Sequence, residues 1–185
     1  DFDIQGDKAF QWNEWELKAE GGVISGEQFV DECQVESDLE LLLPATYVTG
    51  SSERMLLYRE LDSLTLDKDV EDFRTRLIDR FGPIPSETEE LLRIVPLRRL
   101  AARLGAEKVF LKGGRMSLFF VSNPDSPYYQ SQAFGKVIAY MMKYTRRCDL
   151  REQNTRRSML VKDVKNVETA VSVLQEIVAM QVEEG

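Results

Sequence analysis

The chain has 185 residues, of which 43% are hydrophobic and 30% are charged; this balance is typical of a globular domain and excludes an intrinsically disordered chain. Its net charge of −8 at pH 7 disfavours binding to the phosphate backbone of nucleic acids and favours protein partners. Histidine is absent, which removes the commonest general base and the commonest transition-metal ligand, and the two cysteines, Cys33 and Cys148, form no C-x-x-C motif.

The N-terminal residues give no sign of a membrane or secretory segment. No apolar run approaches the roughly 18 to 20 residues that a membrane helix needs, and the first residues are acidic where a secretory signal would be basic and then apolar. We therefore expect a soluble, cytoplasmic protein with reduced thiols and no membrane partner. Residues 1–32 lack a sustained helical or strand period and are interpreted as a linker or the tail of a preceding domain, whereas residues 33–182 are expected to form one domain.

The first predicted elements are a strand and a helix. Over residues 34–43 apolar residues alternate with acidic ones, which predicts a half-buried strand that ends at Pro44. A helix over residues 51–62 is expected next, with Ser51 or Ser52 as its cap. The side chains that this helix is expected to turn inward are Met55, Leu56 and Leu61.

Two further helices are separated by a proline-rich break. A helix over residues 68–80 places apolar side chains three and four positions apart, and the FGPIP segment at residues 81–85 must end it. Ser86 and Glu89 have the spacing of a capping box for a helix over residues 87–104. Within that helix Pro96 predicts a kink or a short break.

The C-terminal half is predicted to contain a hairpin, two helices and one more strand. Gly113-Gly114 lies between apolar runs at residues 108–111 and 116–121, which indicates a tight hairpin turn. Helices are expected over residues 132–144 and 164–180, the second capped by Asp163 or Asn166, with a short strand over residues 158–161 between them. The predicted fold class is α+β, with N-terminal helices followed by a small, mainly antiparallel sheet packed against helices.

No motif of catalysis or nucleotide binding occurs in the sequence, and we expect no catalytic residue, cofactor or metal ion in this chain. Gly113-Gly114 is followed by Arg115-Met116 and so does not begin a phosphate-binding loop. The acidic series Asp67, Asp69, Glu71 and Asp72 could hold Mg²⁺ for hydrolysis, but on a helix these side chains point in different directions. Interaction with the helix dipole explains them more simply.

Two groups of charged residues are candidates for a binding surface. A basic series could form a stripe that contacts DNA or a polymerase, or it could be an ordinary solvated helix face paired with glutamates. Asp79 and Arg80 precede the FGPIP turn; Asp79 either pairs locally or presents a pre-organised acidic surface to a basic partner. The members of the basic series are Arg93, Arg98, Arg99, Arg103, Lys108, Lys112 and Arg115.

The stretch from Leu56 to Val109, with LLLYREL, LIDRFGPIP, LLRI and LRRLAARLGAEKV, resembles the C-terminal domain of bacterial transcription-repair coupling factors, the Mfd family. The resemblance implies a regulatory domain of an ATP-dependent DNA translocase that displaces stalled RNA polymerase and recruits UvrA. ATP and Mg²⁺ would then bind to upstream motor domains, and DNA would be contacted by other domains. The domain itself would be non-catalytic and would mask the UvrA-binding surface of a UvrB-like module.

The resemblance also implies an interface on the helix that leads into the R-F-G turn, where acidic residues face basic ones of the UvrB-like module. Asp79 matches the family pattern, whereas Arg76 stands where some members have an acidic residue, and Asp72 or Glu71 is expected to substitute for it. The expected interface therefore comprises Asp79, Asp72, Glu71, Arg76 and Arg80.

Overall fold

The computed structural model describes residues 29–182, and in this part of the chain helices alternate with strands. The predicted linker, residues 1–32, lies outside the described residues except for its last four. The elements in chain order are β1 (Gln34–Ser37), α1 (Ser51–Ser63), α2 (Asp67–Phe81), α3 (Ser86–Arg103), β2 (Ala106–Lys112), β3 (Arg115–Phe120), the 3-10 helix η1 (Pro127–Gln130), α4 (Gln132–Lys143), β4 (Cys148–Gln153), β5 (Arg156–Val161) and α5 (Val167–Ala179).

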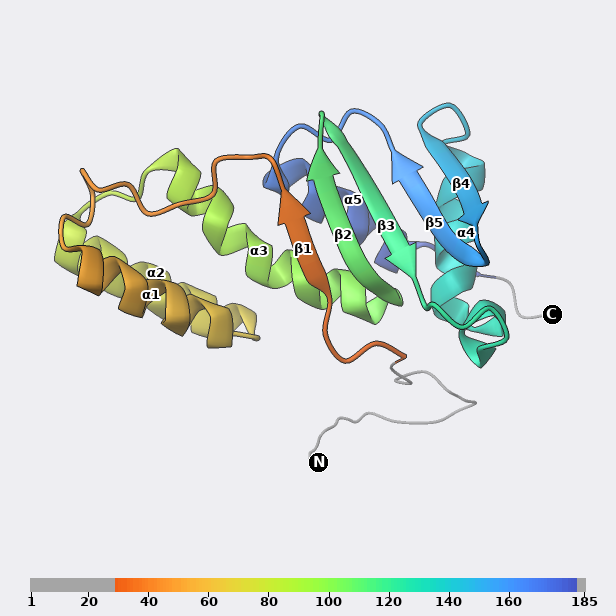
Figure 1. The fold of residues 1–185 in the computed structure, drawn as a ribbon, viewed down its shortest axis with the longest axis horizontal. Coiled ribbons are helices and arrows are strands. Elements are labelled where there is room, and N and C mark those ends of the chain that lie inside the picture. Colours follow the sequence, from red (N-terminus) through yellow and green to blue (C-terminus); the bar gives the residue numbers. More distant parts are fainter. Residues whose placement is uncertain (1–28, 183–185) are drawn as a thin grey trace.

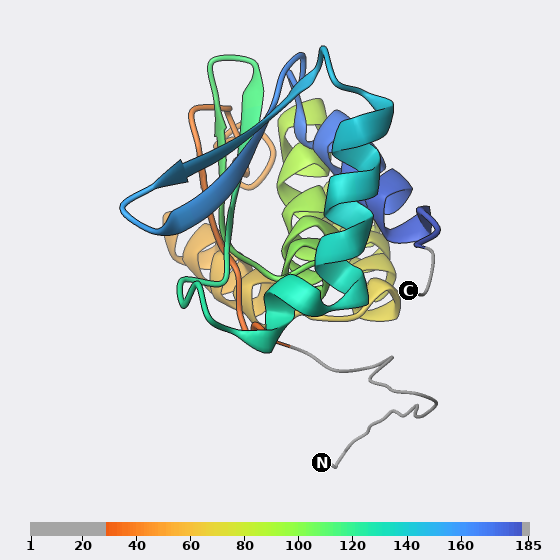
Figure 2. The same cartoon turned by 90° about the vertical axis from the view of Figure 1, so that its right-hand side faces the viewer.

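The strands form one sheet in the order β1-β2-β3-β5-β4. β1 pairs with β2 in parallel, and the other neighbours are antiparallel. Helices α3, α4 and α5 cover one face of the sheet, while no described helix lies on the other face (Figure 1, Figure 2). The α+β class and the mainly antiparallel character of the sheet are confirmed, since three of its four strand pairings are antiparallel. The expected order of helices followed by strands is wrong, because the strands interleave with the helices.

Two hydrophobic cores hold this arrangement together, and α3 contributes to both of them. The larger core lies between the sheet and the helices behind it and is centred on Phe120, Tyr128 and Tyr140, which are fully buried. The smaller core joins α1, α2 and the first half of α3 around Phe73 and Leu77. In Figure 1 the helices α1 and α2 consequently form a lobe at the end of α3 that is remote from α4.

The strand predicted over residues 34–43 ends at Ser37 in the structure. The Leu39 N–H donates to the Ser37 hydroxyl at 3.0 Å, so the chain turns there instead of continuing along β2. Leu39 and Leu41 pack against the larger core, whereas Leu43 lies in the smaller one. The apolar alternation thus reflects burial against two cores in succession and not strand pairing.

The structure corrects the predicted N-terminal caps of α1 and α3 and the predicted inward face of α1. Gly50 precedes α1 and Pro85 precedes α3, and neither helix has a side-chain cap, so the caps at Ser51 or Ser52 and at Ser86 are wrong. The side chains expected inward at Met55 and Leu56 are 59% and 63% exposed. The residues that α1 buries are Leu57 and Leu61, four positions apart on one face. Helix α3 continues through Pro96, which excludes a break there.

The C-terminal half follows the predictions except for one strand. The Gly113-Gly114 hairpin is confirmed, with φ angles of 63° and 72°, and Asn166 caps α5 by accepting the Thr169 N–H at 2.7 Å. Strand β4 was not predicted, because this edge strand exposes all of its side chains except Cys148 and has no apolar alternation. In the part of the chain that the structure describes, no helix is long and apolar enough to cross a membrane.

Candidate protein-interaction surface

Two ion pairs join α1 to α2 along the surface of the helical lobe. Arg76 of α2 pairs with Glu60 of α1, and Arg80 pairs with Glu53. We call these four residues the α1–α2 seam. Because both arginines are more than half exposed, each pair contributes about 0–1 kcal/mol. The two helices are therefore held together mainly by the smaller core, and the seam leaves these arginines partly neutralised from within the domain.

Asp72 and Asp79 lie beside the seam and are exposed. They are seven residues apart on α2, with Arg76 between them, so all three lie on one side of the helix. Among residues 29–182 neither aspartate forms an ion pair or a side-chain hydrogen bond. Local pairing of Asp79, one of the two interpretations of this residue, is not observed among the described residues. Asp72 forms no ion pair there either, although it lies close enough to Arg76 to help Glu60 raise the pKa of that guanidinium.

The end of α2 that carries Asp79 is fixed by the turn that follows it. Gly82 ends the helix with φ 89°, in the region that favours glycine. The Tyr47 hydroxyl donates to the Gly82 carbonyl oxygen at 2.8 Å and to that of Leu77 at 3.3 Å, while its ring lies 5.7 Å from the ring of Phe81. This anchoring lowers the conformational freedom that Asp79 would lose on binding a partner.

Glu71 lies on the opposite flank of α2, toward α3. It pairs with Arg74 at 3.3 Å, and Arg74 also donates to Glu89 of α3 at 2.6 Å. Of the five predicted interface residues, the structure therefore brings together Asp72, Arg76, Asp79 and Arg80 and places Glu71 apart. Asp72 is the acidic side chain that accompanies Asp79.

Sequence reasoning missed an exposed apolar side chain at the seam. Leu56 is 63% exposed and lies three residues after Glu53 and four before Glu60, which places it on the same side of α1 as these glutamates. An apolar side chain beside charged ones is the arrangement expected at the centre and rim of a protein interface. The i, i+4 pair Leu57 and Leu61 was the available signal that Leu56 points outward.

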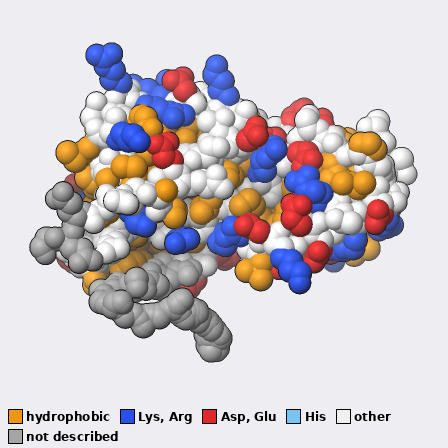
Figure 3. Space-filling model, turned by 180° about the vertical axis from the view of Figure 1, so that it is seen from behind, with side chains coloured by type: hydrophobic (Ala, Val, Ile, Leu, Met, Phe, Trp, Pro, Cys, Tyr) orange, Lys and Arg blue, Asp and Glu red, His pale blue; other side chains and the backbone are white. Residues whose placement is uncertain are grey.

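The other candidate sites do not form single surfaces. Asp67 of the acidic series binds Arg99 at 2.8 Å, and among residues 29–182 no three thiols or carboxylates converge on a possible metal site. The basic series is divided between α3 and the sheet. On the side shown in Figure 3, Lys and Arg side chains are interspersed with acidic ones. Besides Arg99–Asp67, the ion pairs of this series among the described residues are Arg93–Glu90 (2.9 Å), Arg93–Glu168 (3.9 Å), Arg98–Asp62 (3.8 Å), Lys108–Glu36 (3.8 Å) and Lys112–Glu36 (3.5 Å).

Residues 37–131 match the TRCF domain family. Similar curated proteins include the transcription-repair-coupling factors of Rickettsia bellii, 30% identical over 132 residues, and of Staphylococcus haemolyticus, 25% identical over 131 residues. These alignments cover 71% and 68% of the chain but only 11% of each relative. The crystal structure of a C-terminal domain of transcription-repair coupling factor superposes with a TM-score of 0.61 at 17% identity, covering 80% of this chain and 93% of that one. At this identity the structural match concerns the fold.

Proposed function

The chain belongs to the TRCF domain family, the C-terminal domain of transcription-repair coupling factors, and we propose that it is a non-catalytic, autoinhibitory interaction domain. In this proposal it docks on a UvrB-like module of the same cytoplasmic factor and masks the surface that binds UvrA. The whole factor would be an ATP-dependent DNA translocase that displaces stalled RNA polymerase. ATP and Mg²⁺ would bind to its motor domains and not to this one.

The observation that carries the proposal is the pair of unpaired carboxylates, Asp72 and Asp79, on one exposed side of α2. A partner with basic side chains can engage them without first breaking an internal ion pair, because neither aspartate has one among the described residues. Arg76 and Arg80 differ in this respect, since the α1 glutamates already hold them. We assign the direct contact to the aspartates and the positioning of α2 to the smaller core and the Tyr47 hydrogen bond to Gly82.

A modest affinity is sufficient for masking within one chain. A tethered domain meets its docking surface at a high effective concentration, so few contacts are needed to keep it bound. A competing conformational change elsewhere in the factor can then release it, because the masked and open states differ by a small free energy. Electrostatic contacts between exposed charges suit this role, since they give orientation and fast binding more than raw affinity.

The test is UvrA binding by the full-length factor that carries Asp72→Asn and Asp79→Asn. We expect UvrA to bind more tightly, by about tenfold if two exposed charge contacts of about 0.5–1 kcal/mol each are lost. Glu40→Gln with Asp125→Asn is the matched control, because it removes the same charge from two exposed side chains that lie outside α1 and α2 and form no ion pair among the described residues. Equal UvrA binding by the wild-type factor and the aspartate variant, or equal gains in the variant and the control, would contradict the proposal.

A further inference from the structure

Figure 1 shows that one face of the sheet is free of α3, α4 and α5. The strand registers place a row of residues across every strand on this face. The strand registers pair Gln34 with Lys108, Lys108 with Phe119, Phe119 with Ser158, and Ser158 with Arg151. Because partners in a sheet point to the same side, these five residues form one line, which we call the sheet row. From Lys108 to Arg151 it crosses three strand spacings, roughly 14 Å.

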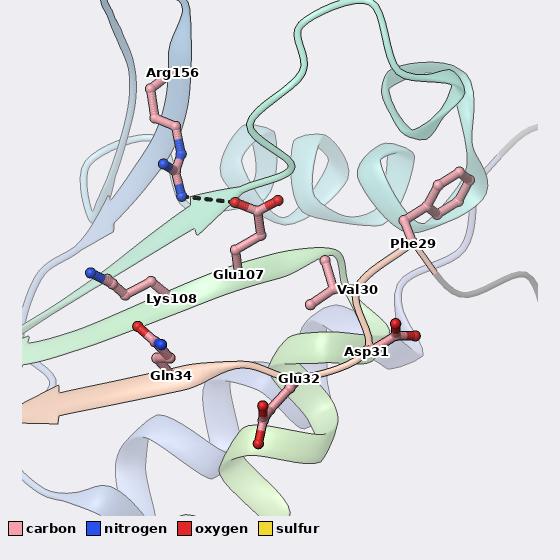
Figure 4. A pocket seen from close by; sticks show the side chains of 8 residues that line it. All are labelled: Phe29, Val30, Asp31, Glu32, Gln34, Glu107, Lys108 and Arg156. Carbon is pink, nitrogen blue, oxygen red and sulfur yellow. Dashed lines mark hydrogen bonds and ion pairs between the residues drawn. The ribbon is translucent and has the colours of Figure 1, made fainter.

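A β-bulge adds an acidic side chain, Glu107, beside the middle of the sheet row, and Glu107 in turn holds Arg156 there. The register between β2 and β3 shifts between Ala106 and Lys108, and a bulge of this kind turns two successive side chains to one face. Glu107 and Lys108 therefore share the uncovered face, and Glu107 accepts a hydrogen bond from Arg156 at 3.0 Å (Figure 4). Figure 4 also shows Lys108 and Gln34 next to one another on neighbouring strands.

Each cation on or beside the sheet row has an acidic neighbour, and of these pairs Arg156–Glu107 is shorter than Arg151–Asp149 and Lys108–Glu36. Arg151 lies 3.7 Å from Asp149, and both side chains are about half exposed, so solvent screens the pair. The Arg156 guanidinium lies over the Phe119 ring at 5.7 Å, and its Nε is buried without a hydrogen-bond partner in the described part of the chain. An incoming anion must therefore compete with Asp149 for Arg151 and with Glu107 for Arg156.

A hollow of about 310 Å³ opens between the two arginines, and none of the described residues that line it is acidic. Its floor includes Phe119, and hydroxyl and amide groups accompany the guanidinium groups of Arg151 and Arg156 on its walls. The polar neutral residues that line it are Ser117, Gln153, Asn154 and Ser158. Such groups both donate and accept hydrogen bonds, which matches sugars and bases in addition to phosphate.

We propose that this uncovered sheet face binds single-stranded nucleic acid, with Lys108, Arg151 and Arg156 contacting its phosphates. Cations interleaved with an aromatic ring on an open sheet are the combination that single-strand binding uses. An acidic peptide is less well matched, because an extended peptide adds to a sheet at its edge through backbone hydrogen bonds and has no need of the face. The inference goes beyond the masking function and uses no residue of α1 or α2.

The first experiment measures the fluorescence anisotropy of a labelled oligothymidylate titrated with the chain at several salt concentrations. Arg151→Gln with Arg156→Gln should weaken binding and reduce the slope of log K against log salt by about 1.4, because each single-strand phosphate contact contributes about 0.7. Arg103→Gln with Arg146→Gln is the matched control: both arginines are exposed and lie outside the strands. Arg151→Gln alone, which changes a side chain that is 60% exposed, gives a variant whose folding is not in question.

Glu107→Gln should change the affinity for the oligonucleotide in the opposite direction. It removes the carboxylate that competes for Arg156, so binding should become tighter. Amide chemical shifts on addition of the oligonucleotide should move at Ser117 and Ser158 and remain constant at Asp72 and Asp79. The proposal is overturned by any of three results: no binding at low salt, an equal loss in the control variant, or equally effective competition by polyglutamate. A negative result here leaves the masking test untouched, because that test reads UvrA binding through α2.

Discussion

Two tyrosine hydroxyls support the helical lobe in opposite hydrogen-bonding roles. Tyr47 donates to the carbonyl oxygens of Gly82 (2.8 Å) and Leu77 (3.3 Å), whereas Tyr58 accepts the backbone N–H of Leu43 at 2.7 Å. In both cases phenylalanine would retain the ring and remove only the hydroxyl. The two substitutions therefore isolate the loss of a donor from the loss of an acceptor.

The two substitutions are expected to lower the free energy of unfolding by different amounts, because each leaves a different backbone group without its hydrogen-bond partner. Leu43 is only 4% exposed, so its N–H would remain buried without a partner, at a cost of about 1–3 kcal/mol. Gly82 is only partly buried, so its carbonyl can turn to water, and the loss is that of an ordinary hydrogen bond, about 0.5–1.5 kcal/mol. We expect Tyr58→Phe to lower the free energy of unfolding by about 2 kcal/mol and Tyr47→Phe by about 1 kcal/mol.

Urea denaturation followed by far-ultraviolet circular dichroism measures both free energies, and calorimetry provides the midpoints independently. For a domain of this size each kcal/mol lowers Tm by roughly 2–4 °C. Each variant serves as the control for the other, since both remove one phenolic oxygen near the smaller core. A larger cost for Tyr47→Phe than for Tyr58→Phe, or no cost for either, would refute the reasoning from burial of the Leu43 amide.

Two further predictions concern the larger core. Gly105 has φ +87°, and an added Cβ would overlap the buried ring of Tyr128, so Gly105→Ala should cost on the order of 3 kcal/mol or more in thermal unfolding. Gly113→Ala, at φ +63° with open space around it, should cost only about 1–2 kcal/mol, and equal costs would contradict this account. Burial raises the pKa of Cys33 from 9.0 to about 12, an effect that Arg98 partly opposes. The Cys33 thiol should therefore resist a disulfide reagent at pH 8 until the protein unfolds, and rapid reaction of the folded protein would be inconsistent with burial. Because the pKa is higher in the folded state than in the unfolded state, the stability that the buried thiol contributes should be lost as pH rises from 9 toward 12.

The predictions from sequence succeeded where apolar residues recur on one face of an element and failed where that signal is ambiguous. Helix α2 was located by its buried residues three and four apart. In Met55-Leu56-Leu57 three consecutive apolar side chains leave the inward one undetermined, and only packing against the smaller core selects Leu57. Strand β4 gave no signal because an edge strand in solvent needs no apolar face.

The two candidate surfaces differ in how much of each could be predicted from the sequence. Asp72 and Asp79 share one helix, so their common side follows from helical spacing alone. The sheet row joins residues from five strands through long-range registers, and the bulge that turns Glu107 and Lys108 to the same face leaves no mark in local periodicity. Long-range pairing of this kind is visible only once the sheet is formed.

The net charge of a chain averages over surfaces that bind different partners, and this limits which classes of ligand it can exclude. The value of −8 for the whole chain argues against nucleic-acid binding only if the charge is evenly distributed. On the uncovered sheet face it is not, since Arg151 and Arg156 line a hollow and none of the other described residues that line it is acidic. Beyond about one Debye length, roughly 8–10 Å in physiological salt, the acidic residues of the α1–α2 lobe contribute little to the potential at that hollow. One acidic chain can therefore carry an anionic docking surface and a cationic one, provided that they lie on different parts of the fold.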